Sequence, residues 1–143
     1  MIRRLAFLPF LTRFDDAALL ALRLMVGAFL IYGVWDNIVS AERMAEFVGF
    51  LGKFGFLAPE FMAPLSVWAQ FLCGVAFILG LFTRWAGLIC AFNFVVAIAM
   101  VDYHTGIRGS FPSACLVFIG LYLAAHGAGW FSLDRLIGRS EQP

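Results

Sequence analysis

Charged residues are scarce in this sequence: Asp, Glu, Lys and Arg make up 13% of its 143 residues, against about 25% in an average soluble domain. The net charge of +1 leaves neither a basic patch nor an acidic tail, which argues against a nucleic-acid-binding protein. The three cysteines contain no C-x-x-C pair, and no group of His or Cys residues has the spacing of a zinc site. We therefore expect no metal site.

Apolar residues are abundant instead, at 63% of the chain, and the mean hydropathy is +0.93. A helix needs about 20 mostly apolar residues to cross the hydrocarbon core of a bilayer. Four runs reach or approach that length, at residues 17–35, 64–81, 85–101 and 111–127. The sequence therefore predicts an all-α protein, with a single integral membrane domain that forms a four-helix bundle in the lipid bilayer.

The connections between these runs differ in length and character. The second and third runs are separated only by residues 82–84, so their helices must be antiparallel neighbours. The long first connection contains residues 41–54, in which charged side chains such as Glu46 fall on one helical face and apolar ones such as Leu51 on the other. This pattern predicts an amphipathic helix that lies on the outer membrane interface.

The distribution of basic residues predicts the orientation of the chain. Cytoplasmic flanks of membrane helices carry more Lys and Arg than outer flanks. Six such residues fall on one side of the expected bundle and three on the other; the first set is Arg3, Arg4, Arg13, Arg84, Arg135 and Arg139, and the second is Arg43, Lys53 and Arg108. We therefore expect a multi-pass protein of the cell (cytoplasmic) membrane with both termini in the cytoplasm.

Three polar side chains lie within the apolar runs. Arg23 in the first run and Asn93 in the third are expected at similar heights, and Gln70 lies in the second run. Polar groups at membrane depth are costly, so they are the first candidates for a ligand site. Arg23 could be held by Asn93 or by a carbonyl and bind an anionic or carbonyl-bearing ligand; alternatively, its guanidinium extends to the inner interface. Arg23, Asn93 and Gln70 are the candidate ligand-binding residues.

A second set of polar residues falls near the expected outer ends of the helices. Asp36, Asn37, Asp102 and His104 could together line a polar vestibule, or they could simply be solvated where helices end. The two histidines, His104 outside and His126 near the inner end, cannot ligate one haem within a single chain, although a haem shared between subunits stays open.

Small residues recur on the fourth run at four-residue spacing, at Gly120, Ala124 and Ala128. Such a stripe lets two helices approach closely, either inside the bundle or between subunits. Contact inside the bundle is the simpler expectation.

Three stretches of the chain resemble the DoxX family of four-span membrane proteins. They are Leu22-Arg23-Leu24 with Gly27 and Gly33, Gly74 with Leu79-Gly80-Leu81-Phe82-Thr83-Arg84, and Gly127 and Gly129 with Ser132-Leu133-Asp134-Arg135. The resemblance implies a compact four-helix membrane bundle. It also implies an association with quinone-linked redox chemistry, as in a subunit of thiosulfate:quinone oxidoreductase, or with the docking of soluble oxidoreductases.

The chain departs from the family pattern in its second run. Relatives often carry a glutamate where this chain has Gln70, and a glycine where it has Cys73. If that carboxylate carries protons in relatives, the same route is absent here.

Two functions follow from these observations. The first is a redox-associated subunit that binds a quinone in the bundle through Arg23, Asn93 and Gln70. The second is a non-enzymatic anchor or assembly partner, for a soluble oxidoreductase or a second copy of the chain, that uses residues 41–54 or the small-residue stripe. Transport is a third possibility that would need a dimer. No complete catalytic constellation is present, so the sequence does not identify a reaction.

Overall fold

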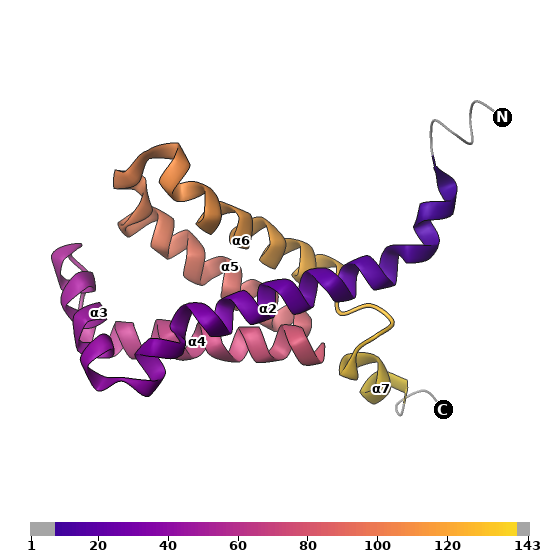
Figure 1. Cartoon of the computed structure of the whole chain (residues 1–143), viewed down its shortest axis with the longest axis horizontal. Helices are drawn as coiled ribbons and strands as arrows, with labels where there is room; N and C mark the ends of the chain where they lie inside the picture. Colours follow the sequence, from indigo (N-terminus) through magenta and orange to yellow (C-terminus); the bar gives the residue numbers. More distant parts are fainter. Residues whose placement is uncertain (1–7, 140–143) are drawn as a thin grey trace.

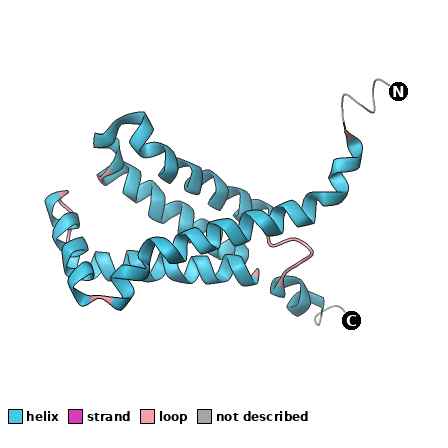
Figure 2. Ribbon diagram, viewed as in Figure 1, coloured by secondary structure: helices cyan, strands magenta, loops and turns pink. Residues whose placement is uncertain are grey.

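The computed structural model describes residues 8–139, and every regular element within them is helical, which confirms the predicted all-α fold (Figure 2). Arg3 and Arg4 of the predicted basic head lie outside these residues. The elements are η1 (Pro9–Phe14), α2 (Asp15–Val39), α3 (Ala41–Lys53), α4 (Pro59–Leu79), α5 (Thr83–Met100), η2 (Asp102–Thr105), α6 (Gly106–His126) and α7 (Leu133–Arg139).

Four of these helices, α2, α4, α5 and α6, are long and apolar enough to cross a membrane. Each begins two to five residues before the corresponding apolar run in the sequence. The difference lies in the first turns, which contain residues that favour the start of a helix but do not belong to an apolar run. Asp15 and Asp16 open α2, and Pro59 opens α4.

The four long helices form two closely packed antiparallel pairs, α2 with α4 and α5 with α6. Glycines allow the close approach in each pair. A methyl group placed on Gly27 of α2 would lie 2.6 Å from the carbonyl oxygen of Gly74 of α4, and one placed on Gly120 of α6 would lie 2.7 Å from that of Gly87 of α5. The small-residue stripe on α6 therefore packs inside the bundle, at least at Gly120.

The predicted hairpin between α4 and α5 is present, with only residues 80–82 between the helices. The two pairs meet at this turn and then diverge along their length (Figure 1). The principal neighbour of α4 is therefore α2 rather than α5. We call the end of the bundle near the α4–α5 turn the α7 end, because α7 lies there, and the opposite end the α3 end.

Helix α3 runs across the ends of α2 and α4 and contacts both (Figure 1). Ser40 caps its first turn by accepting a hydrogen bond from the backbone N–H of Arg43. Leu51 is buried against the bundle, whereas Glu42, Glu46 and Lys53 are exposed. The predicted amphipathic helix is thus confirmed, and its apolar face covers the ends of α2 and α4.

The core of the bundle is contributed by all four long helices. Leu30, Phe77 and Leu123 are fully buried there, and Arg23, at 1% exposure, is equally inaccessible. Large apolar side chains such as Phe92 and Phe118 instead point outward, at more than 70% exposure. An apolar exterior around a small core is the arrangement expected when lipid surrounds the helices.

Candidate functional site

Arg23, the most deeply placed charge, is surrounded by backbone carbonyl groups. Its Nε donates to the carbonyl oxygen of Phe77 at 2.9 Å, and its Nη2 to that of Ile78 at 3.4 Å, both near the end of α4. Its Nη1 donates to the carbonyls of Ala128 and Phe131 in the segment after α6, the latter at 2.9 Å. Four of the five N–H groups of the guanidinium are therefore occupied by the protein itself.

The backbone beside Arg23 is shaped to receive it. Gly80 follows α4 with a φ of +65°, a conformation that L side chains rarely adopt. A methyl group on Gly80 would also lie 2.9 Å from Cζ of Arg23 and 2.6 Å from Cβ of Ser132. Glycine is therefore required at this position by both conformation and space.

Two further side chains fasten the same end of the bundle. Asp134 at the start of α7 accepts hydrogen bonds from the backbone N–H groups of Phe82 at 2.7 Å and Thr83 at 3.0 Å, where α5 begins. Arg84 donates to the last carbonyls of α6, at 2.9 Å to Ala124 and 2.6 Å to Ala125. We call Arg23, Arg84 and Asp134 the clasp, because they tie α2, α4, α5, α6 and α7 together at the α7 end.

The other predicted residues of the membrane interior form a separate group near mid-helix. The hydroxyl of Ser66 donates to Oδ1 of Asn93 at 2.8 Å and accepts from Nε2 of Gln70 at 3.2 Å, which joins α4 to α5. Ser66 and Gln70 lie about 10 and 16 Å along α4, and Asn93 about 15 Å along α5, at 1.5 Å per residue. We call Ser66, Gln70 and Asn93 the amide cluster.

The sequence left two possible partners for Arg23, the side chain of Asn93 or a backbone carbonyl. In the structure Arg23 donates to carbonyls. Gln70 and Asn93 do meet, through Ser66. Ser66 was not among the predicted residues, although its i,i+4 spacing from Gln70 places both on one face of α4.

The amide cluster retains unused hydrogen-bonding groups. Among the described residues, none accepts a hydrogen bond from Nδ2 of Asn93 and none donates one to Oε1 of Gln70. All three side chains are half-buried, so they reach the surface of the bundle. An amide exposed to lipid without a partner costs several kcal/mol, so these atoms require one.

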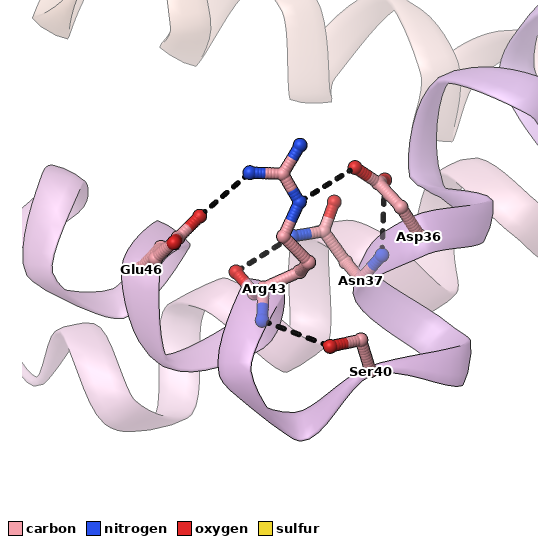
Figure 3. Close-up of polar contacts among 5 residues, drawn as sticks. All are labelled: Asp36, Asn37, Ser40, Arg43 and Glu46. Carbon is pink, nitrogen blue, oxygen red and sulfur yellow. Dashed lines mark hydrogen bonds and ion pairs between the residues drawn. The ribbon is translucent and has the colours of Figure 1, made fainter.

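The predicted outer residues lie in two groups at the α3 end. In the first, Asp36 and Glu46 both contact Arg43, at 3.4 Å and 2.8 Å, and Asn37 donates to the carbonyl of Arg43 at 3.1 Å (Figure 3). The hydrogen bond from Arg43 to Glu46 and the charges of both carboxylates raise the pKa of Arg43 above its ordinary value. This group braces the corner between α2 and α3.

In the second group, Asp102 accepts a hydrogen bond from Ser113 through its side chain and others from Thr105 and Ser110 through its carbonyl. The ring of His104 lies 6.1 Å from that of Phe54, which directly follows α3. Among the described residues, the two groups share no hydrogen bond or ion pair. The ring contact between His104 and Phe54 links the second group to the end of α3.

The amino-acid sequence is similar to those of known membrane proteins. Residues 18–103 match the sequence model of the DoxX family, and this stretch covers more than half of the chain. The chain belongs to the DoxX family. It is also 26% identical over 132 residues to the inner membrane protein YqjF of Escherichia coli (strain K12), a match that covers 89% of this chain and 97% of that protein. No solved structure matches the chain. It is therefore a multi-pass membrane protein of the cell membrane.

The DoxX resemblance now has a structural explanation. The three stretches that carry it are separated in sequence, but the clasp brings them together, with Arg23 from the first, Arg84 from the second and Asp134 from the third. The residues that carry the resemblance therefore meet at the α7 end; residues 127–135 lie beyond the matched stretch 18–103. Gln70 and Asn93, which have unused hydrogen-bonding groups near the bundle surface, lie outside the clasp. Thr83 also has a hydroxyl without a partner among the described residues, but it is fully buried beside Asp134.

Proposed function

We propose that this DoxX protein binds a carbonyl-bearing, lipid-soluble ring, with a quinone as the expected ligand, at the amide cluster. One observation supports the proposal above all: two amide groups at membrane depth have hydrogen-bonding atoms without a partner among the described residues. The amide N–H groups of Asn93 suit a quinone carbonyl, and Oε1 of Gln70 suits the hydroxyl of the reduced ring.

The position of the amide cluster also favours a ligand that arrives through the lipid. Its three side chains are half-buried and join α4 to α5. These two helices belong to the pairs that diverge from the α4–α5 turn (Figure 1). Neither Asn93 nor Gln70 can ionise, so the cluster can orient a ring but cannot itself take up its protons. The proposed role is accordingly a quinone-binding subunit of a redox system, with the proton and electron chemistry carried out elsewhere.

Arg23, part of the original candidate set, has a different proposed role. Its guanidinium is 1% exposed and four of its N–H groups are occupied by carbonyls. We assign it to structural stabilisation and leave Asn93 and Gln70 as the proposed ligand contacts.

The alternative function, an anchor or assembly partner, keeps the exposed face of α3 but loses part of the other surfaces on which it was based. Gly120 of the small-residue stripe packs on Gly87, and Leu51 of α3 is buried against the bundle. A cytoplasmic location of both ends remains our proposal, because Arg13, Arg84 and Arg135 are at the α7 end; reporter fusions at the C-terminus and in the loop after α3 test it.

The ligand proposal is tested by purifying the protein in mild detergent and extracting bound quinone for mass spectrometry. We expect about one quinone per chain in the wild type and a loss of most of it in Asn93→Leu and Gln70→Leu. Ser110→Ala is the matched control, because this hydroxyl bonds only to carbonyls near the α3 end. A wild-type protein that carries no quinone and binds none when it is added would contradict the proposal.

A further inference from the structure

A pocket at the α3 end is separate from the amide cluster. It has a volume of about 530 Å³ and is lined by charged residues and by the rings of Phe47 and Phe50. Clefts that bind small molecules usually have volumes of about 300–1,000 Å³. The pocket is therefore large enough for a small polar group with an adjoining apolar segment.

The charges in this pocket are arranged as a dipole. At one side, Asp36 and Glu46 surround the single guanidinium of Arg43, so two negative charges face one positive charge (Figure 3). At the other side is Lys53, which makes no hydrogen bond or ion pair with any described residue. Glu46 and Lys53 are seven residues apart on α3, about 10 Å along its axis. One side of the pocket thus has a net charge of −1 and the other of +1.

The location of the pocket restricts what can reach it. Helix α3 crosses the end of the membrane-spanning helices, where lipid headgroups lie beside an interfacial helix (Figure 1). The rings of Phe47 and Phe50 are stacked with centroids 6.3 Å apart and offer an apolar wall beside the charges. A ligand that fits must therefore carry both charges and an apolar portion.

We propose that this pocket binds the headgroup of a zwitterionic membrane phospholipid, with its phosphate at Lys53 and its primary ammonium at Asp36 and Glu46. A primary ammonium donates three hydrogen bonds, which two carboxylates can accept, whereas a quaternary ammonium donates none. The glycerol and the start of the acyl chains lie against Phe47 and Phe50. Phosphatidylethanolamine has this chemistry, and phosphatidylcholine and phosphatidylglycerol each lack one part of it.

The test is native mass spectrometry of the full chain released from nanodiscs that contain the three lipids in equal amounts. We expect one retained phosphatidylethanolamine per chain, with retention reduced about threefold or more in Lys53→Gln and in Glu46→Gln. Two controls match these changes in charge: Arg108→Gln near the start of α6 and Glu60→Gln in the first turn of α4, both at exposed positions outside the pocket. Both controls are expected to retain the lipid as the wild type does.

Other outcomes would overturn the proposal. Equal retention of the three lipids, or retention that is unchanged in both pocket variants, would remove the zwitterionic site. Displacement of the lipid by an equal concentration of soluble phosphoethanolamine would show that the pocket recognises the same chemistry from a small molecule rather than from the membrane. Lys53 and Glu46 are exposed, so their variants are expected to fold, and a single size-exclusion peak verifies this.

Discussion

The clasp and the amide cluster are both polar regions of an apolar bundle, but they differ in how completely the protein satisfies them. In the clasp, Arg23 uses four N–H groups on carbonyls, and both oxygens of Asp134 accept backbone N–H groups. In the amide cluster, Asn93 and Gln70 share one serine hydroxyl and keep other atoms unused. A polar group whose hydrogen bonds are mostly supplied by the protein stabilises a fold, whereas a half-exposed one with unused atoms at membrane depth is a candidate to bind a ligand.

The largest expected effect comes from removing the guanidinium of the clasp. Arg23→Leu leaves the carbonyls of Phe77, Ile78, Ala128 and Phe131 without their donor. Each buried polar group left unpaired costs about 1–3 kcal/mol. We therefore expect the free energy of unfolding to fall by more than about 4 kcal/mol, with little folded protein. Size-exclusion chromatography in mild detergent measures the monodisperse fraction.

Arg13→Leu is the control for this change, because Arg13 is an exposed arginine just before α2. It is expected to leave the yield of folded protein unchanged. If Arg23→Leu were as stable as this control, the clasp would not be the structural element that the geometry indicates.

The next effect tests how tightly the backbone closes around Arg23. Gly80 and Gly55 both have positive φ values, +65° and +77°, but a methyl group on Gly80 would collide with Arg23 while one on Gly55 would meet open space. In both turns the next residue donates its backbone N–H to the carbonyl five positions back, so the conformational penalty of about 1–2 kcal/mol applies to both alanine substitutions. We expect Gly80→Ala to lower the thermal unfolding midpoint in detergent clearly more than Gly55→Ala. Equal shifts would show that only backbone conformation matters at Gly80.

The sequence predicted where the helices lie in the chain better than which helices pack against each other. Apolar runs identify the four helices because lipid requires them, and the charge pattern of residues 41–54 identifies α3. The pairing of α2 with α4 was not predictable from loop length, since it depends on the contact between Gly27 and Gly74. The acceptors of Arg23 were equally hidden, because a backbone carbonyl has no sequence signal.

Two of the three residues of the amide cluster were predicted from the sequence, and one was not. Polar residues inside apolar runs are visible in a sequence, so Gln70 and Asn93 were found. Ser66 was missed because a serine is common in membrane helices, where it can bond to its own helix backbone. Only the structure shows that its hydroxyl joins α4 to α5.

A smaller effect is expected where a charge of the clasp is replaced and its shape is kept. Asp134→Asn retains one carbonyl acceptor for the N–H groups of Phe82 and Thr83 but loses the second acceptor and the charge that stabilises Arg23. Hydrogen bonds to a charged acceptor are about twice as strong as neutral ones, so we expect a loss of about 1–2 kcal/mol, measured as a lower unfolding midpoint. Asp15→Asn, at an exposed position in the first turn of α2, should change it by a few tenths of a kcal/mol.

The smallest effect on stability, and the sharpest contrast, is expected at the amide cluster. Ser66→Ala removes the two hydrogen bonds through which Gln70 and Asn93 are joined. Hydrogen bonds between membrane helices contribute about 0.6 kcal/mol on average, because freed groups find other partners, and these amides are only half-buried. The unfolding midpoint of the empty protein should therefore fall far less than in Arg23→Leu. The amides would no longer be held together, however, and the increase in midpoint on adding a quinone should shrink. A variant that loses stability as Arg23→Leu does, with its response to quinone intact, would place Ser66 with the clasp and remove the difference between the two regions.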